Sequence, residues 1–158
     1  MLPVRALRNG DLEQILALAR KTGVFTSAEI AVVNELVDIE STNPGQEDYH
    51  SFVADENGQV VGFACYGPTP MTEGTYDLYW IFVDPERYRR GVAGLLLEKV
   101  EKAVRRAKGR MLIADTSSSR PYGPARRFYQ RHGFRNVAEV KDYYSAGDSR
   151  LTYVKQLA

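Results

Sequence analysis

The 158-residue chain has one cysteine, two histidines and almost no excess charge, with 21 Lys and Arg against 20 Asp and Glu. A single cysteine cannot form a disulfide within the chain. A near-neutral charge argues against nucleic acid or an anionic membrane as the main partner. His50 and His132 stand far apart in the sequence and indicate neither a metal site nor a catalytic triad. We therefore predict no metal, no nucleic-acid partner and no membrane partner.

Long apolar runs are also missing. No run reaches the roughly 18 apolar residues that span a bilayer, and Met1–Arg5 lacks the apolar core of a signal peptide. We expect a soluble, cytoplasmic protein. The length suits a single domain over residues 1–158 that buries its core without disulfides. Cys65 lies in the apolar run 60–66 and is expected to be a buried, unreactive core residue.

Hydrophobic periodicity predicts an alternation of strands and helices. Strands are expected at 4–7, 52–54, 60–66, 75–83 and 111–114, and two more within 136–157. Asn57-Gly58 predicts a tight hairpin between the second and third strands. Helices are expected around 12–19, 30–37, 91–107 and 124–131. The order is βααβββαβαββ, which indicates an α+β fold around one mixed sheet.

A helix start rich in small residues follows the strand at 75–83. Gly91, Ala93 and Gly94 let a ligand approach main-chain N–H groups at the positive end of the helix dipole. Three arginines add local positive charge just before this helix: Arg87, Arg89 and Arg90. A pyrophosphate would fit there. Taken alone, the segment also fits an ordinary helix start with solvated arginines.

Two sequence motifs carry a resemblance to a known family. The chain has neither a P-loop nor a Gly-x-Gly-x-x-Gly fingerprint. Tyr88–Ala93 instead resembles the acyl-CoA motif of the GNAT superfamily of N-acetyltransferases, Gln/Arg-x-x-Gly-x-Gly/Ala, with Tyr88 in place of Gln or Arg. Residues 125–134 resemble the second motif of that family, Ala-x-x-Phe-Tyr-x-x-x-Gly-Phe. An Asn that often lies seven residues before the motif Tyr is replaced here by Tyr122.

The resemblance covers essentially the whole chain. It implies a three-layer α/β/α fold with a mixed, mostly antiparallel sheet and helices on both faces. It also implies acetyl-CoA as co-substrate, with the main chain at 81–83 meeting the pantetheine arm and thioester where adjacent strands splay apart. The implied contacts with coenzyme A are Ile81, Phe82, Val83, Tyr88, Arg89, Arg90, Gly91, Val92, Ala93, Gly94 and Arg126.

Amine acetylation needs a proton acceptor for the amine and a proton donor for the departing thiolate. Tyr129 matches the motif Tyr that serves as general acid, although it would also fit a buried aromatic beside Phe128. Asp115 matches a proton-accepting Glu of the ribosomal-protein acetyltransferases, and Asp77 a Glu of the histone-type enzymes. We prefer Asp115 as the base, because it ends the strand before the Tyr129 helix, and assign Asp77 to attracting the amine. Loss of the proton to solvent stays open.

Aromatic residues near predicted strand ends are candidates for the wall of an acceptor site. An aromatic wall with nearby carboxylates suits a cationic amine, although each ring alone would also fit the core. Residues 142–148 resemble the substrate-side tail of the ribosomal-protein acetyltransferases. The candidate acceptor-binding residues are Phe25, Tyr79, Trp80, Tyr143 and Tyr144.

From these observations we predict an N-acetyltransferase that moves an acetyl group from acetyl-CoA to a primary amine by direct attack in a ternary complex. The acceptor is a small-molecule amine or a protein N-terminus, and a homodimer stays open. The main alternative is a catalytically silent module that senses acyl-CoA or docks a partner.

Overall fold

A computed structural model describes residues 2–88 and 90–158. In chain order the elements are β1 (Val4–Ala6), α1 (Asp11–Lys21), α2 (Ser27–Thr42), β2 (His50–Glu56), β3 (Gln59–Pro68), β4 (Thr75–Val83), the 3₁₀ turn η1 (Pro85–Arg87), α3 (Val92–Arg106), β5 (Met111–Ser117), the 3₁₀ turn η2 (Arg120–Tyr122), α4 (Gly123–Arg131), β6 (Arg135–Ser145) and β7 (Asp148–Gln156). This order of helices and strands confirms the one predicted from the sequence.

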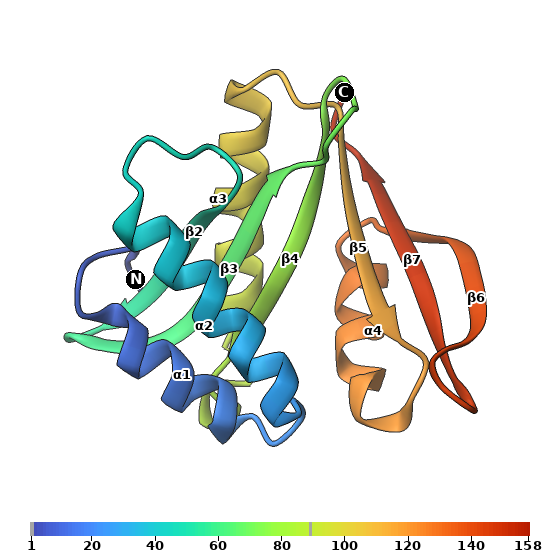
Figure 1. The fold of residues 1–158 in the computed structure, drawn as a ribbon, viewed down its shortest axis with the longest axis horizontal. Coiled ribbons are helices and arrows are strands. Elements are labelled where there is room, and N and C mark those ends of the chain that lie inside the picture. Colours follow the sequence, from blue (N-terminus) through green and yellow to red (C-terminus); the bar gives the residue numbers. More distant parts are fainter. Residues whose placement is uncertain (1, 89) are drawn as a thin grey trace.

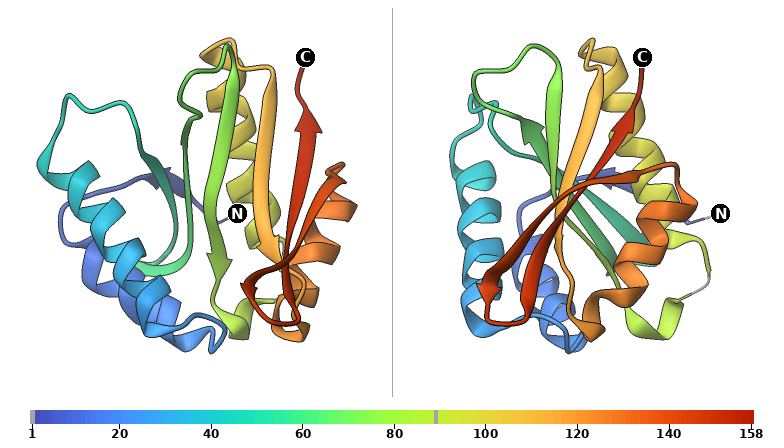
Figure 2. Two further views of the ribbon diagram at one scale, coloured as in Figure 1. Left: turned by 45° about the vertical axis from the view of Figure 1, so that its right-hand side comes forward. Right: turned by 90° about the vertical axis from the view of Figure 1, so that its right-hand side faces the viewer.

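The strands form one sheet between two layers of helices. Over the described residues the strand order is β1-β2-β3-β4-β5-β7-β6, and every neighbouring pair is antiparallel except β4 and β5. Figures 1 and 2 show α1 and α2 on one face and α3 and α4 on the other. The predicted three-layer fold with a mixed, mostly antiparallel sheet is confirmed.

The core has one cluster on each face of the sheet, and the cluster on the α3 and α4 face extends over β5 and β7. On one face α1 and α2 bury residues such as Ile15 and Val33 against Phe63. On the other face α3 approaches closely, because a Cβ at Gly62 would lie 2.9 Å from the Leu96 side chain. Cys65 belongs to the first cluster, and burial raises the pKa of its thiol to about 12. The thiol is therefore buried and protonated, as predicted.

Short turns fix the register of the sheet. Asn57 and Gly58 both have left-handed φ, 53° and 87°, and join β2 to β3 with Glu56 opposite Gln59. Such a two-residue turn matches the twist of the strands that it connects, so the predicted Asn-Gly hairpin is confirmed. Among the helices that the structure describes, none is long and apolar enough to cross a membrane.

Strands β4 and β5 separate after a short paired stretch. Their parallel pairing runs only from Thr75 opposite Met111 to Asp77 opposite Ile113, although β4 continues to Val83 and β5 to Ser117. A register shift in β4 leaves Tyr79 without a partner in β3, since Cys65 pairs with Trp80 and Tyr66 with Leu78. A bulge of this kind bends a strand. Figure 1 shows that β4 and β5 diverge beyond their short paired stretch.

Candidate active site

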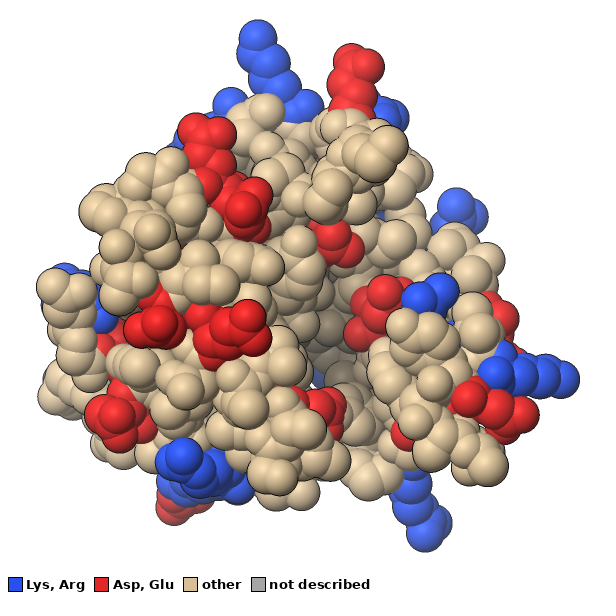
Figure 3. Space-filling model, in the orientation of Figure 1, with Lys and Arg blue, Asp and Glu red and all other residues tan. Residues whose placement is uncertain are grey.

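The opening between β4 and β5 is a hollow on the molecular surface. Figure 3 shows the hollow near the middle of that face, with acidic side chains on its rim. Because β4 and β5 no longer pair beyond Asp77 and Ile113, the main chain of each strand can meet a ligand that enters between them. Ile81, Phe82 and Val83, the predicted contacts for the pantetheine arm, lie in the part of β4 that pairs with β3 but no longer with β5. Their contact with coenzyme A stays a prediction.

Helix α3 starts at the open end of β4. Gly91 is its N-cap with a left-handed φ of 75°, and a Cβ at Gly91 would meet none of the described residues within 4 Å. The first N–H groups of an α-helix have no partners within the helix, so this exposed start can bind an anion. A Cβ at Gly94 would lie 3.3 Å from His132 Nε2, which brings the start of α3 against the end of α4. The two sequence motifs therefore meet in space.

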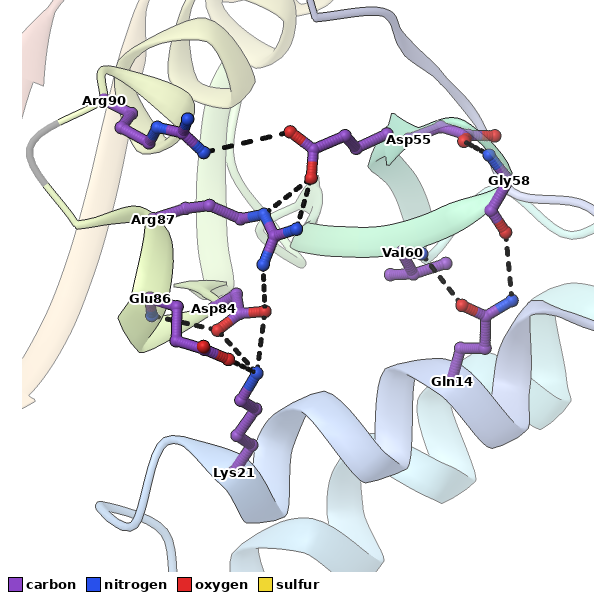
Figure 4. Close-up of polar contacts among 10 residues, drawn as sticks. Gln14, Lys21, Asp55, Gly58, Val60, Asp84, Glu86, Arg87 and Arg90 are labelled. Carbon is purple, nitrogen blue, oxygen red and sulfur yellow. Dashed lines mark hydrogen bonds and ion pairs between the residues drawn. The ribbon is translucent and has the colours of Figure 1, made fainter.

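The loop between β4 and α3 is tied to the rest of the fold by Asp84, as Figure 4 shows. This carboxylate is buried, accepts a hydrogen bond from Glu86 N–H at 3.0 Å, and pairs with Lys21 of α1 and with Arg87. Burial alone would raise the pKa of Asp84, but the Glu86 N–H and the two cations hold it below its usual value. The ion pairs fix the loop that precedes Gly91.

Arg87 does not supply free charge for an anion. Its guanidinium contacts Glu56 of the β2–β3 hairpin and Asp84, so two carboxylates neutralise it. The prediction that Arg87 adds positive charge to the site is therefore wrong, because the sequence does not show that Glu56 lies opposite. Arg90 and Tyr88 are exposed, and Arg90 lies 3.9 Å from Glu56. Arg89 lies outside the described residues.

Tyr129 is buried beside β5 and β7. Its ring centroid lies 5.2 Å from that of Phe134 and 5.6 Å from that of Tyr153. Burial raises the pKa of Tyr129, and the charge of Asp115 raises it further. The hydroxyl therefore stays protonated over the physiological pH range and can serve as a hydrogen-bond donor near Asp115.

Arg126 lies one turn before Tyr129 and contacts the main chain. Its Nη1 donates to the carbonyl oxygens of Ser117 and Ser119, at 2.7 and 2.8 Å. These bonds order the loop between β5 and α4. A contact between Arg126 and coenzyme A stays a prediction.

The two candidate carboxylates have different surroundings. Burial raises the pKa of Asp77, and the charge of Asp115 adds to the effect, while the Thr69 hydroxyl that donates to Asp77 Oδ2 at 2.7 Å opposes it. Asp115 is more exposed; its Oδ1 accepts from the Thr152 hydroxyl at 2.6 Å and lies 3.9 Å from Arg150 Nε. Since Asp77 pairs with Ile113, two residues before Asp115, both carboxylates point to the same face of the sheet.

The predicted acceptor aromatics fall into two groups. Phe25 and Trp80 pack edge to face, with ring centroids 5.3 Å apart, and both lie against the core cluster of α1 and α2. Tyr79, Tyr143 and Tyr144 are exposed. Burial and the neighbouring Asp77 raise the pKa of Tyr79 to about 12. The first group is partly exposed and the second is exposed, and a role in acceptor binding stays a prediction for all five residues.

Tyr122 closes one end of the opening. Its hydroxyl donates to Glu29 Oε2 of α2 at 2.9 Å, and its ring centroid lies 6.4 Å from that of Phe25. Burial and the bond to Glu29 raise the pKa of Tyr122. The residue therefore links the loop before α4 to the helices on the other face, a contact that no sequence motif indicates.

Sequence reasoning also missed Arg150 of β7. Its guanidinium carbon lies 4.5 Å from the ring centroid of Tyr143. Arg150 and Thr152 alternate along β7, and Thr152 pairs with Asp115, so the period of two places them on the face that carries Asp115. That alternation was a usable signal, but nothing in the sequence showed which strand lies beside β5. No group of three or more potential metal ligands occurs within residues 2–88 and 90–158.

Comparisons with known proteins agree with this geometry. The family model described as acetyltransferase (GNAT) domain matches residues 47–136. A crystal structure of a protein assigned to the GNAT family of acetyltransferases from Desulfovibrio desulfuricans is 42% identical, with a TM-score of 0.93 and 100% of both chains covered. A comparison with curated proteins finds no match.

Two more distant structures share the fold. The ribosomal-protein-S18-alanine N-acetyltransferase from Escherichia coli is 19% identical with a TM-score of 0.79, over 100% of this chain and 95% of that one. The PaiA N-acetyltransferase from Thermoplasma acidophilum, in complex with coenzyme A, is 16% identical with a TM-score of 0.75, over 99% of both chains. The family model and the 42% identical structure show that the chain belongs to the GNAT family of acetyltransferases.

Proposed function

We propose that the protein transfers an acetyl group from acetyl-CoA to a primary amine by direct attack within a ternary complex. The observation that carries the proposal is the opening between β4 and β5. Asp77 and Asp115 lie on the two strands that flank it, the start of α3 follows β4, and the buried Tyr129 is near enough to Asp115 for that charge to raise its pKa. The similar acetyltransferase from Thermoplasma acidophilum, which was crystallised with coenzyme A, supports the choice of cofactor.

Coenzyme A would lie with its pyrophosphate on the main chain at residues 91–94. The left-handed Gly91 and the open space around it allow close approach, and the helix dipole favours the negative charge. The ion pairs of Asp84 hold the preceding loop in place, so this cradle needs little rearrangement on binding. The pantetheine arm would follow the side of residues 81–83 that faces β5, where β4 has no strand partner, into the opening.

The chemical step needs the neutral amine. Burial raises the pKa of Asp77, which makes its carboxylate a better proton acceptor, whereas Asp115 already contacts Thr152 and Arg150. We therefore assign proton removal to Asp77 and retention of the ammonium group to Asp115. This assignment reverses the preference for Asp115 as the base that was drawn from the sequence, because the burial of a side chain cannot be read from the sequence.

In the transfer itself the amine nitrogen forms a bond to the thioester carbon, and the carbon–sulfur bond then breaks. The amine proton passes to Asp77, and the Tyr129 hydroxyl donates a proton to the departing sulfur. Solvent then takes the proton from Asp77 and returns one to Tyr129, so the step has no net change in protons. Because the pKa of Tyr129 is raised, this hydroxyl is available as a donor at every pH at which the amine can react. No covalent enzyme intermediate is needed.

The test is a screen of primary amines with acetyl-CoA, which follows free thiol and identifies the acetylated product by mass spectrometry. The panel includes amino acids, short peptides, diamines and aminoglycosides. We expect thiol release that depends on both the enzyme and one amine class, and that is strongly reduced in Tyr129→Phe. Binding of acetyl-CoA without amine-dependent thiol release over the whole panel would contradict the proposal and favour a silent acyl-CoA-binding module.

A further inference from the structure

Arg150 is a partly buried cation beside the candidate carboxylates. Its side chain is 31% exposed, and its Nε is buried without a hydrogen-bond partner among the described residues. The nearest carboxylate oxygen, Asp115 Oδ1, lies 3.9 Å from Nε, which is beyond hydrogen-bonding distance. A buried donor without a partner is costly, so its position calls for an explanation.

The surroundings of Arg150 hold the guanidinium in one orientation. The Tyr143 ring lies 4.5 Å from its central carbon, and Asp115 lies on the neighbouring strand β5, which flanks the opening. Arg150 is opposite Ser117 in β5 and two residues from Thr152, so it shares a sheet face with Asp115. A guanidinium stacked on an aromatic ring presents its N–H fork edgewise, which suits a planar carboxylate.

We propose that Arg150 binds a carboxylate of the acceptor, and that the acceptor is therefore an amino acid or a close analogue. The proposal rests on the proposed acetyl transfer. The ammonium-binding carboxylate Asp115 and the guanidinium of Arg150 lie next to each other, so one small molecule meets both only if its amine and its carboxylate are a few bonds apart. Polyamines and aminoglycosides carry no carboxylate for Arg150.

A carboxylate fits this position better than a phosphate group. Arg150 lies beside the carboxylate of Asp115, and Asp148 lies two residues before Arg150 in the same strand. One delocalised negative charge is matched by one guanidinium. A phosphate monoester carries close to two charges at neutral pH and would be repelled by the neighbouring carboxylates.

The experiment compares amino acids with their carboxamides as acceptors in wild type, Arg150→Gln and Arg150→Lys. We expect wild type to favour the carboxylate member of a pair, and Arg150→Gln to lower kcat/KM for that member about ten- to a hundredfold while changing the carboxamide little. Arg150→Lys should recover part of the loss, because it keeps the charge without the fork. Arg105→Gln, at the far end of α3, is the matched control and should behave as wild type.

The selectivity ratio within each pair separates binding from a structural role. If Arg150→Gln lowers both members equally, or if wild type favours the carboxamides, the carboxylate site is excluded while acetyl transfer stands. If wild type acetylates no amine, the proposed function fails. The carboxylate site is then tested by titrating the protein, saturated with coenzyme A, with N-acetylamino acids and their carboxamides. The carboxylate site is supported if wild type binds N-acetylamino acids but not their carboxamides, and if Arg150→Gln loses that binding. The site is overturned if wild type binds the two kinds of compound equally or binds neither.

Discussion

The half of the sheet formed by β1 to β4 is covered on both faces, whereas helix α4 covers only one face of the half formed by β5, β7 and β6 (Figures 1 and 2). The first half carries the start of α3, where recognition uses main-chain groups and ion pairs fix the loop. The second half carries Asp115, Arg150 and Tyr143 on its open face. The first half, whose loop is fixed by ion pairs, thus suits binding of the cofactor through main-chain groups. The second half, with one uncovered face, suits binding of an acceptor that is selected by side chains.

The largest effect should come from the cofactor half. Gly91→Glu places a carboxylate where we expect a pyrophosphate, and repulsion at about 4 Å should weaken acetyl-CoA binding on the order of a thousandfold. Isothermal titration measures the loss. Gly10→Glu is the control, since Gly10 is also a left-handed N-cap with open space around it, but at α1. If Gly91→Glu and Gly10→Glu bound acetyl-CoA with equal affinity, the start of α3 would be excluded as the pyrophosphate site.

The next largest effect concerns Tyr129, the proposed proton donor. Tyr129→Phe should lower kcat about a hundredfold while acetyl-CoA affinity stays the same, because only the donor to the departing sulfur is lost. Single-turnover kinetics and titration separate these two quantities. Tyr153→Phe, whose ring lies 5.6 Å from that of Tyr129, should leave the rate unchanged. If Tyr129→Phe kept full turnover, Tyr129 would have no catalytic role and would serve only in core packing.

A third variant measures how firmly the first half is held. Asp84→Asn leaves Lys21 and Arg87 without their shared partner and should lower the free energy of unfolding by about 2 kcal/mol at neutral pH. The pKa of Asp84 is lowered in the folded state, so this contribution is present above the ordinary aspartate pKa and is lost as pH falls through the folded value. Urea unfolding at pH 7 and near pH 3 should show the gap between wild type and variant closing in acid.

Glu98→Gln is the control for that measurement. Glu98 pairs with Lys102 on the exposed side of α3, and both side chains are more than half exposed. Water and salt screen such a pair, so unfolding should be unchanged within error. An equal loss of unfolding free energy in Asp84→Asn and Glu98→Gln would show that the buried ion pairs of Asp84 stabilise the fold no more than an exposed pair does.

The smallest effect concerns the open half. Asp77→Asn should lower kcat/KM about tenfold at neutral pH and remove the acidic limb that titration of Asp77 gives the wild-type profile. The loss should shrink at high pH, where more amine is already neutral. The raised pKa of Asp77 places the acidic limb of the wild-type profile above the ordinary aspartate range. Asp115→Asn should mainly raise the acceptor KM. The opposite pattern would return the base to Asp115, and two unchanged profiles would leave proton removal to solvent.

Much of the fold could be predicted from the sequence because its signals are local. The strand and helix order follows from hydrophobic periodicity, and the Asn57-Gly58 hairpin from the left-handed φ that such residues tolerate. The start of α3 at Gly91 follows from the spacing of small residues after a strand. The burial of Cys65 follows from the apolar run around it.

Other features depend on which segments meet in space. Arg87 was misjudged as free charge because Glu56, 31 residues earlier in the chain, lies against it only in the folded hairpin. The raised pKa of Asp77 depends on burial, which a strand pattern does not measure. Arg150 lies near Asp115 only because β7 pairs with β5 in the folded sheet, and no sequence motif surrounds it.

The sequence by itself determined the order of elements, the two motifs and therefore the family, because each of these depends on residues close together in the chain. Tertiary structure alone decided where β4 and β5 part, which arginines are neutralised and which carboxylate is desolvated. Those features depend on distances between residues far apart in sequence. Electrostatic interactions weaken with distance and with exposure to water, so the charge that a ligand meets is set by the folded chain.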